Sequence, residues 1–192
     1  MSKFNECLTL KFPGLSRILY TPIAVSLPAK GDPLAKHNIN CIWDTGCSTT
    51  TITKNVVDAL GLKQTGVTKV NTASDTGKLT ETYEIDLYIS DRLFFKNITV
   101  NLGKICDGID CLLGMDIIGT GDLSITNLNG NTCMSFRHPS LHEIDFLKNP
   151  HFGTKGDKNP MPSAANNYAG TPRNATCPCG SNKQYKRCHG KS

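Results

Sequence analysis

The strongest chemical signal in the sequence is a carboxylate at a sharp turn between two β-prone segments. In Cys41 to Ile52, CIWDTGCSTTTI, an apolar run leads into Asp44, Thr45 and Gly46, and a Ser/Thr run follows. Gly46 lets the backbone approach closely, and Thr45 can form a hydrogen bond within the turn. This pattern suits activation of water by two carboxylates that share one proton, because two like charges about 3 Å apart cannot both ionise.

A second group of chemically active residues lies at the C-terminal end. Three cysteines and one histidine fall within 13 positions in the pattern C-x-C, eight residues, C-H: Cys177, Cys179, Cys188 and His189. Three thiolates and one imidazole suit tetrahedral Zn²⁺ in a closed, structural site. The segment has few aliphatic side chains, so we expect metal binding and folding to be one event. The sequence predicts one structural zinc ion per chain and no cofactor for catalysis.

Charge divides the chain of 192 residues, whose net charge is +5, into two parts. Residues 1–147 carry 13 basic and 15 acidic residues, whereas residues 148–192 carry 8 basic and 1 acidic. A nucleic-acid-binding body is therefore disfavoured, and RNA contact by the basic tail stays open. No run approaches the roughly 18 apolar residues of a membrane span. Nine cysteines without an export signal favour a reducing, cytoplasmic location.

Strand-like runs separated by turns dominate residues 1–147 and predict a mostly β domain, a barrel or a sandwich. The expected strands are Arg17–Leu27, Cys41–Trp43, Ser48–Ile52, Val67–Thr72, Leu79–Ile89, Phe94–Leu102, Leu123–Thr126 and Cys133–Arg137. Thr53 is expected to cap a short helix that stops at Gly61. Residues 148–173 are rich in Asn, Gly and Pro and predict a flexible linker, and residues 174–192 form the zinc module.

The segment around Asp44 resembles the retropepsin family of aspartic proteases. A second block, Cys111 to Ile118 (CLLGMDII), matches the family's apolar-apolar-Gly element, and the order of the blocks also matches from about Arg17 to Arg137. The resemblance implies a closed β-barrel with one lobe per chain, which acts as a homodimeric aspartic endopeptidase. Each copy would give Asp44 at the two-fold axis.

The same resemblance assigns roles to the rest of the active site. Thr45 would brace the loop of the second copy, and Gly46 would face the substrate, an extended peptide or protein segment bound as an added strand. A second triplet, Asp75-Thr76-Gly77, lacks the apolar strand and the Ser/Thr run. We therefore interpret it as the hairpin turn of a flap that closes over the substrate, with Ala73 and Ser74 before it.

The C-terminal cluster resembles the SEC-C motif, the zinc-binding tail of the bacterial preprotein translocase ATPase SecA. The match includes Pro178, Gly180, Ser181, Lys183, Tyr185, Lys186 and Gly190, while Asn182 stands where the motif more often has Gly. The resemblance implies a docking element for a chaperone or the ribosome.

Two positions leave alternatives open. Cys47 follows the Asp44 triplet where retropepsins usually have Ala or Ser, and we interpret it as a small buried residue. Asp44 itself could be an acidic turn of an inactive barrel. The protein would then be a non-catalytic adaptor: a retropepsin-like dimer that binds proteins by strand addition, with a zinc tail that docks to a chaperone, the ribosome or RNA.

Overall fold

The computed structural model of the chain describes residues 6–29, 35–71, 76–147, 171–176, 183–188 and 190. The chain separates into two compact units, Met1–His142 and Glu143–Ser192, and each is described by itself. No helix among the described residues is long and apolar enough to cross a membrane.

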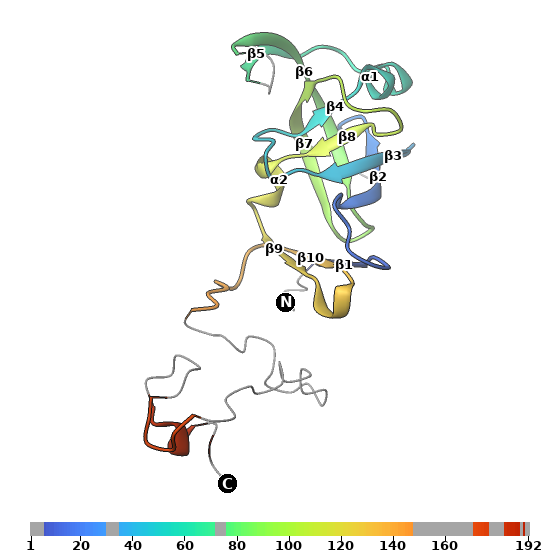
Figure 1. Cartoon of the computed structure of the whole chain (residues 1–192). Coiled ribbons are helices and arrows are strands. Elements are labelled where there is room, and N and C mark those ends of the chain that lie inside the picture. Colours follow the sequence, from blue (N-terminus) through green and yellow to red (C-terminus); the bar gives the residue numbers. More distant parts are fainter. Residues whose placement is uncertain are drawn as a thin grey trace. The chain divides into compact units, whose positions relative to one another are not determined.

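Strands make up most of the regular structure in the first unit (Figure 1). They are β1 (Glu6–Lys11), β2 (Tyr20–Ser26), β3 (His37–Trp43), β4 (Thr51–Ile52), β5 (Gly66–Val70), β6 (Lys78–Tyr88), β7 (Phe94–Leu102), β8 (Cys111–Leu113), β9 (Asp122–Thr126) and β10 (Cys133–His138). The helical segments are α1 (Lys54–Leu60), α2 (Met115–Ile118) and the 3₁₀ turn η1 (Leu128–Gly130).

Six of these strands close into a barrel. Their order is β2-β3-β8-β4-β7-β6, and β6 pairs with β2 to complete the circle. The β3–β8 and β4–β7 pairs are parallel, and the other pairs in the barrel are antiparallel. Strand β5 extends β6 into a hairpin at one end of the barrel (Figure 1). The predicted fold class, mostly β with a closed barrel, is confirmed.

The barrel core comes from alternating apolar side chains on these strands. Val25, Cys41, Ile52, Ile85 and Leu113 are completely buried. Such alternation gives each strand one face toward the core, and this fixes the register of the barrel.

A smaller sheet with the strand order β1-β10-β9 adjoins the barrel. Met134 and Phe136 of β10 are completely buried, and the Phe136 ring packs 5.0 Å from the ring of Trp43. The indole N–H of Trp43 donates to the Thr21 hydroxyl at 2.7 Å. Trp43 immediately precedes Asp44, so the small sheet and the barrel together fix the end of β3.

The cap of helix α1 and the length of strand β4 differ from the prediction. The end of α1 is as predicted, because Gly61 takes the left-handed conformation with φ of 60°. Thr53 occupies the N-cap position but forms no side-chain cap bond, and its hydroxyl is buried without a partner. The predicted strand Ser48–Ile52 is reduced to Thr51–Ile52, because the preceding residues are hydrogen-bonded to α2 instead.

Candidate active site

Asp44 lies directly after β3, at the rim of the barrel. Its backbone N–H donates to the carbonyl of Leu113 at 3.0 Å, which ties the turn to β8. Its Oδ1 accepts the Gly46 N–H at 2.9 Å, and its carbonyl accepts the Cys47 N–H at 3.1 Å. A Cβ at position 46 would lie 3.2 Å from this Oδ1, so glycine leaves room for the carboxylate. The Asp44 side chain is half-buried, and Thr45 and Gly46 are exposed.

Helix α2 holds the chain that leaves the turn. The Met115 N–H donates to the Cys47 carbonyl at 2.7 Å, and the Asp116 N–H donates to the Ser48 carbonyl at 3.2 Å. A Cβ at Gly114 would lie 2.8–2.9 Å from backbone atoms of Thr49 and Cys47 and from the Asp116 carboxylate. The Leu-Leu-Gly block is therefore a close-packing partner of the Asp44 turn, which explains why the two blocks occur together.

The Asp116 carboxylate completes this interlock, and sequence reasoning gave it no role. It accepts the Thr50 N–H at 2.9 Å and the Thr50 hydroxyl at 2.8 Å. The Thr50 hydroxyl oxygen in turn accepts the Gly114 N–H at 3.1 Å. The available sequence signal was a threonine, Thr50, inside the Ser/Thr run, together with an aspartate, Asp116, directly after Gly114 and Met115.

The cysteines near the turn are packed inside the unit. Cys47 is half-buried, with Sγ 2.9 Å from the carbonyl of Thr49 and 3.7 Å from the hydroxyl of Thr51. Cys41 and Cys111 are register partners on β3 and β8 and are both completely buried. The pKa of the Cys111 thiol lies well above its usual value. The hydrogen bond with the Cys41 thiol is the main cause, and burial is the second. Cys111 therefore stays protonated, as expected of a core residue rather than a nucleophile.

The residues predicted to form a flap, 73–77, fall in the sequence between β5 and β6, whose hairpin is tied to the barrel where the Thr80 hydroxyl donates to the Leu102 carbonyl at 2.6 Å. Of the predicted flap residues, Ala73, Ser74 and Asp75 lie outside the described residues. Thr76 and Gly77 precede β6. Gly77 has a φ of 68°, and its N–H donates to the Asn71 side chain at 2.9 Å. This left-handed conformation favours glycine and fits a turn.

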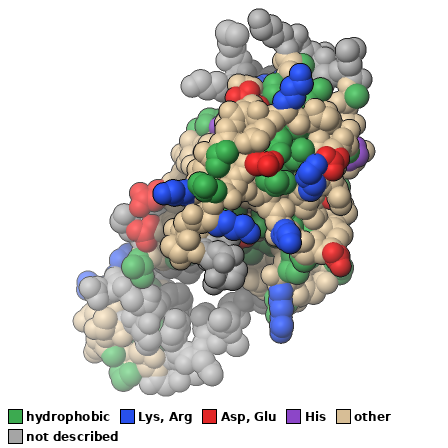
Figure 2. Space-filling model, turned by 90° about the horizontal axis from the view of Figure 1, so that it is seen from above, with side chains coloured by type: hydrophobic (Ala, Val, Ile, Leu, Met, Phe, Trp, Pro, Cys, Tyr) green, Lys and Arg blue, Asp and Glu red, His purple; other side chains and the backbone are tan. Residues whose placement is uncertain are grey.

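Charged side chains are mixed on the end of the barrel that carries α1 and β5. Figure 2 shows Lys and Arg interspersed with Asp, Glu and apolar groups on this face. A single-sign surface of the kind that binds nucleic acid is not seen on this face.

The second unit is described in part. Thr176 forms an isolated antiparallel bridge with Gln184, and the Tyr185 N–H donates to the Ala175 carbonyl at 2.8 Å. A 3₁₀ turn, η2 (Tyr185–Arg187), leads to the half-buried Cys188. Of the predicted zinc ligands, Cys177, Cys179 and His189 lie outside the described residues. The bridge places Thr176, the residue before Cys177 in the sequence, beside Gln184.

Comparison with known proteins agrees with both halves of this description. Residues 31–117 match the family model named Aspartyl protease, and residues 173–191 match the SEC-C motif. The predicted resemblance is thus confirmed: the chain contains a region similar to aspartyl proteases, and a match to the SEC-C motif follows it.

Each individual relative resembles one of these two regions. The protein translocase subunit SecA of Acidothermus cellulolyticus is 83% identical over 23 residues, which are 12% of this chain and 2% of that protein. The chain therefore spans a very small part of this curated relative. A solved structure of a retropepsin-like aspartic protease from Rickettsia conorii is 20% identical, with 70% of this chain and 95% of that chain covered and a TM-score of 0.44. The retroviral protease-like domain of Ddi1 from Leishmania major is 14% identical, with 68% of this chain and 99% of that chain covered and a TM-score of 0.39.

Proposed function

We propose that the protein is an aspartic-type endopeptidase whose catalytic carboxylates are Asp44 of two copies of the chain. The observation that carries the proposal is the position of Asp44, half-buried at the end of an apolar strand and locked between two glycine-containing blocks. A catalytic group requires such a fixed position, whereas an ordinary acidic surface turn does not.

The second carboxylate has to come from another copy of the chain. Among the described residues Asp44 is the single Asp in this strand–turn context, and Asp116 is engaged by Thr50. A closed two-fold dimer places identical residues opposite each other at its axis. Two Asp44 side chains on that axis would form the required pair, so a homodimer is part of the proposal.

Chemistry follows from one proton shared by this pair. The ionised carboxylate takes a proton from a water molecule, whose oxygen attacks the peptide carbonyl carbon. The protonated carboxylate donates a hydrogen bond to the carbonyl oxygen. When the tetrahedral intermediate collapses, the C–N bond breaks and a carboxyl proton passes to the leaving nitrogen. Neither step needs a metal, and zinc in the tail would be structural.

Substrate would lie between the Asp44 turn and the β5–β6 hairpin. One face of this hairpin exposes Val67 and Leu79, which offer apolar contact, beside Lys69. An extended peptide would obtain its affinity from main-chain hydrogen bonds and its selectivity from side-chain contacts. Thr45, Gly46 and the flap residues Ala73 to Gly77 keep the roles that the retropepsin resemblance implies.

The SEC-C tail would act as the docking element, in the cytoplasm. Three thiolates and an imidazole are a donor set that holds zinc, and we assign Cys177, Cys179, Cys188 and His189 as its ligands. The basic residues beside them, Lys183, Lys186 and Arg187, suit an acidic protein surface or phosphate. A chaperone or the ribosome would then hold the protease near its substrates.

Cleavage of an unbiased peptide library tests the proposed reaction. The full chain is compared with Asp44→Asn and with Asp58→Asn, a matched control at an exposed position of α1, from about pH 3 to about pH 8. We expect cleavage by the wild type and by Asp58→Asn. Asp44→Asn should lose about 1,000-fold or more in rate, because it removes the shared ionisable pair.

Equal cleavage by Asp44→Asn would overturn the assignment of the catalytic residue. An intact library at every pH, from a protein shown to be dimeric, would instead favour the adaptor that binds peptides without cleaving them.

A further inference from the structure

Strands β6 and β7 pair across an irregularity that holds a buried carboxylate. Their register shifts between Ile85 and Leu87, where Asp86 of β6 stands opposite Lys96 and Asn97 of β7. Asp86 is 1% exposed and accepts the Asn97 N–H at 2.8 Å and the Lys96 ammonium at 3.0 Å. Asn97 has a positive φ of 52°, a conformation that few residues other than glycine adopt. Irregularities of this kind re-aim side chains and are common beside functional sites.

The irregularity directs Lys96 toward two aromatic rings. The Lys96 ammonium donates to the Tyr88 hydroxyl at 2.9 Å and lies 5.2 Å from the centroid of the Tyr88 ring and 5.7 Å from that of Phe94. The two rings are tilted neighbours with centroids 5.8 Å apart. A second lysine, Lys36, lies just before β3 and places its ammonium 4.1 Å from the same Tyr88 centroid. Two cations from distant parts of the sequence therefore converge on one ring.

We call these four residues, Lys36, Tyr88, Phe94 and Lys96, the Tyr88 surface. Its positive charge is incompletely balanced, because Asp86 neutralises Lys96 whereas Lys36 has no ion-pair partner among the described residues. Both lysines are exposed, and Phe94 is 41% exposed. An ammonium group held over an aromatic face keeps its charge and can still bind an anion. The surface thus offers positive charge and an exposed apolar ring side by side.

We propose that the Tyr88 surface binds an acidic segment of a partner protein. One carboxylate would pair with Lys36, a second would lie near Lys96, and an apolar side chain beside them would pack on Phe94. Charge complementarity selects this partner, because positive charge attracts acidic chains. Phosphate is matched less well, since the planar fork of arginine, which binds phosphate through two bonds, is absent from the four residues. Nucleic acid is disfavoured because residues 1–147 carry more acidic than basic residues.

The Tyr88 surface is separate from the candidate active site. Lys36 precedes His37, the first residue of β3, whereas Asp44 follows Trp43, the last. A strand of this length keeps its two ends about 20 Å apart. The inference therefore goes beyond the proposed function, because the surface would hold an acidic partner whether or not Asp44 cleaves peptide bonds.

A labelled acidic peptide tests the inference on the full chain. The probe is rich in Glu and contains Phe, and the protein carries Asp44→Asn so that the probe stays intact. Lys36→Glu should raise the dissociation constant of the probe about tenfold, since attraction becomes repulsion, and should improve binding of a peptide with Lys in place of Glu. Phe94→Ser should raise the dissociation constant of the probe about threefold through lost apolar contact. Fluorescence anisotropy measures these values.

The control variant is Lys63→Glu, which makes the same charge change at an exposed lysine after α1. It should keep the dissociation constant within about twofold, because salt screens a distant charge. Since the basic tail also attracts acidic chains, carbodiimide cross-linking and mass spectrometry identify the lysines that touch the probe. We expect Lys36 among the linked residues and Lys63 outside them. Improved binding of the Lys peptide by Lys36→Glu shows that this variant folds.

Four outcomes would overturn the inference. An unchanged dissociation constant in Lys36→Glu is one, and cross-links that fall on the tail alone are another. Equal affinity for the probe and for a peptide with Gln in place of Glu would show that charge does not select the partner. A phosphoserine peptide that binds more than about tenfold more tightly than the Glu probe would assign the surface to phosphate instead. None of these measurements depends on cleavage, so they remain decisive if the proposed function fails.

Discussion

Thr50 shows how single residues hold the candidate site together. It is completely buried, yet both its N–H and its hydroxyl have partners, because the Asp116 carboxylate accepts from both. The same carboxylate accepts the N–H of Ile117 at 3.0 Å, which stabilises the first turn of α2. One side chain thus joins the segment after Asp44 to the helix after Gly114. A half-buried carboxylate with three donors is costly to remove, since each donor is left unsatisfied.

Asp116→Ala should therefore destabilise the barrel strongly. We expect a loss of about 2 to 4 kcal/mol in the free energy of unfolding, because the Thr50 N–H and hydroxyl lose their acceptor in a buried place. Asp116→Asn keeps one acceptor oxygen and should cost about half as much. The measurement is urea denaturation at neutral pH.

The control for this prediction is Asp58→Ala, which breaks an exposed ion pair with Lys54 on α1. It should cost less than about 0.5 kcal/mol. Equal losses for Asp116→Ala and Asp58→Ala would show that the Asp116 contacts contribute nothing special. At this scale the sequence context made Asp44 the candidate catalytic residue, which stays a prediction. It could not identify Asp116, because the contact joins residues 66 positions apart.

Elements were predicted well where the alternation of side chains was local. The two strands joined by the Asn129-Gly130 turn pair as expected, and Asn129 has a positive φ of 54°. Strand β1 was not predicted. Its alternating pattern Glu6–Lys11 is short, and it is stabilised by pairing with β10, more than 120 residues later. Strand β4 is shorter than predicted because the barrel uses the backbone of Ser48 to Thr50 to hold α2.

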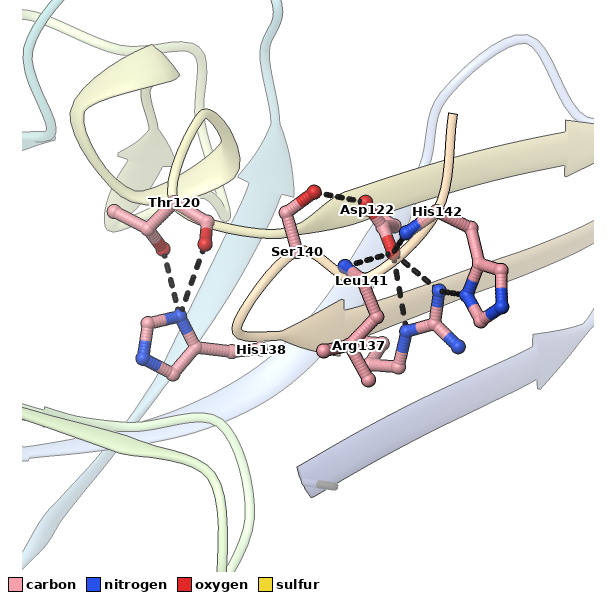
Figure 3. A network of polar contacts seen from close by, with 7 residues as sticks. All are labelled: Thr120, Asp122, Arg137, His138, Ser140, Leu141 and His142. Carbon is pink, nitrogen blue, oxygen red and sulfur yellow. Dashed lines mark hydrogen bonds and ion pairs between the residues drawn. The ribbon is translucent and has the colours of Figure 1, made fainter. Parts of the chain in front are cut away.

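The junction of β9 and β10 depends on one carboxylate. Figure 3 shows Asp122 of β9 facing Arg137 of β10 and the chain from Ser140 to His142. The carboxylate accepts the Ser140 hydroxyl, the Leu141 N–H at 2.9 Å and the Arg137 Nε–H at 3.1 Å. The Ser140 bond above all, then the Leu141 N–H and Arg137, hold the pKa of Asp122 well below its usual value, against the opposing effect of burial.

Stability should therefore depend on pH through Asp122. Its folded-state pKa lies below the unfolded value of about 4, so its contribution is complete above that value. The contribution is lost as the pH falls through the unfolded pKa toward the folded one. Asp122→Asn should cost about 1 to 3 kcal/mol at neutral pH, and the difference from wild type should shrink below about pH 4.

Urea unfolding at several pH values between about 7 and 2.5 measures this difference. Asp58→Asn, at an exposed site, should have the same free energy of unfolding as the wild type at every pH. The role given to Asp122 would be contradicted if the difference in free energy of unfolding between wild type and Asp122→Asn stayed constant down to the lowest pH.

The whole molecule combines two units that reach stability by different means. The first has a core of completely buried aliphatic side chains, among them Val25, Ile52, Ile85 and Leu113. The second contains most of the basic excess and few aliphatic residues, and its described part is held by short backbone contacts around Tyr185. A segment of this composition cannot order itself by burial alone. If zinc supplies the missing free energy, then the metal should affect one unit and leave the other unchanged.

Zinc content and thermal unfolding of the full chain test this separation. We expect one zinc per chain, lost in Cys177→Ser combined with Cys188→Ser, because thiolates provide most of the ligand set. Removal of zinc by a chelator should increase hydrogen exchange at residues 173–190 and leave the barrel's melting temperature within about 1 °C, since zinc binding is coupled to folding of the tail alone. The control is Cys106→Ser in an exposed loop of the barrel unit, which should keep the full zinc content. Zinc that stays bound in the double variant would place the metal elsewhere. A barrel that melts at a lower temperature without zinc would mean that the two units share their stability.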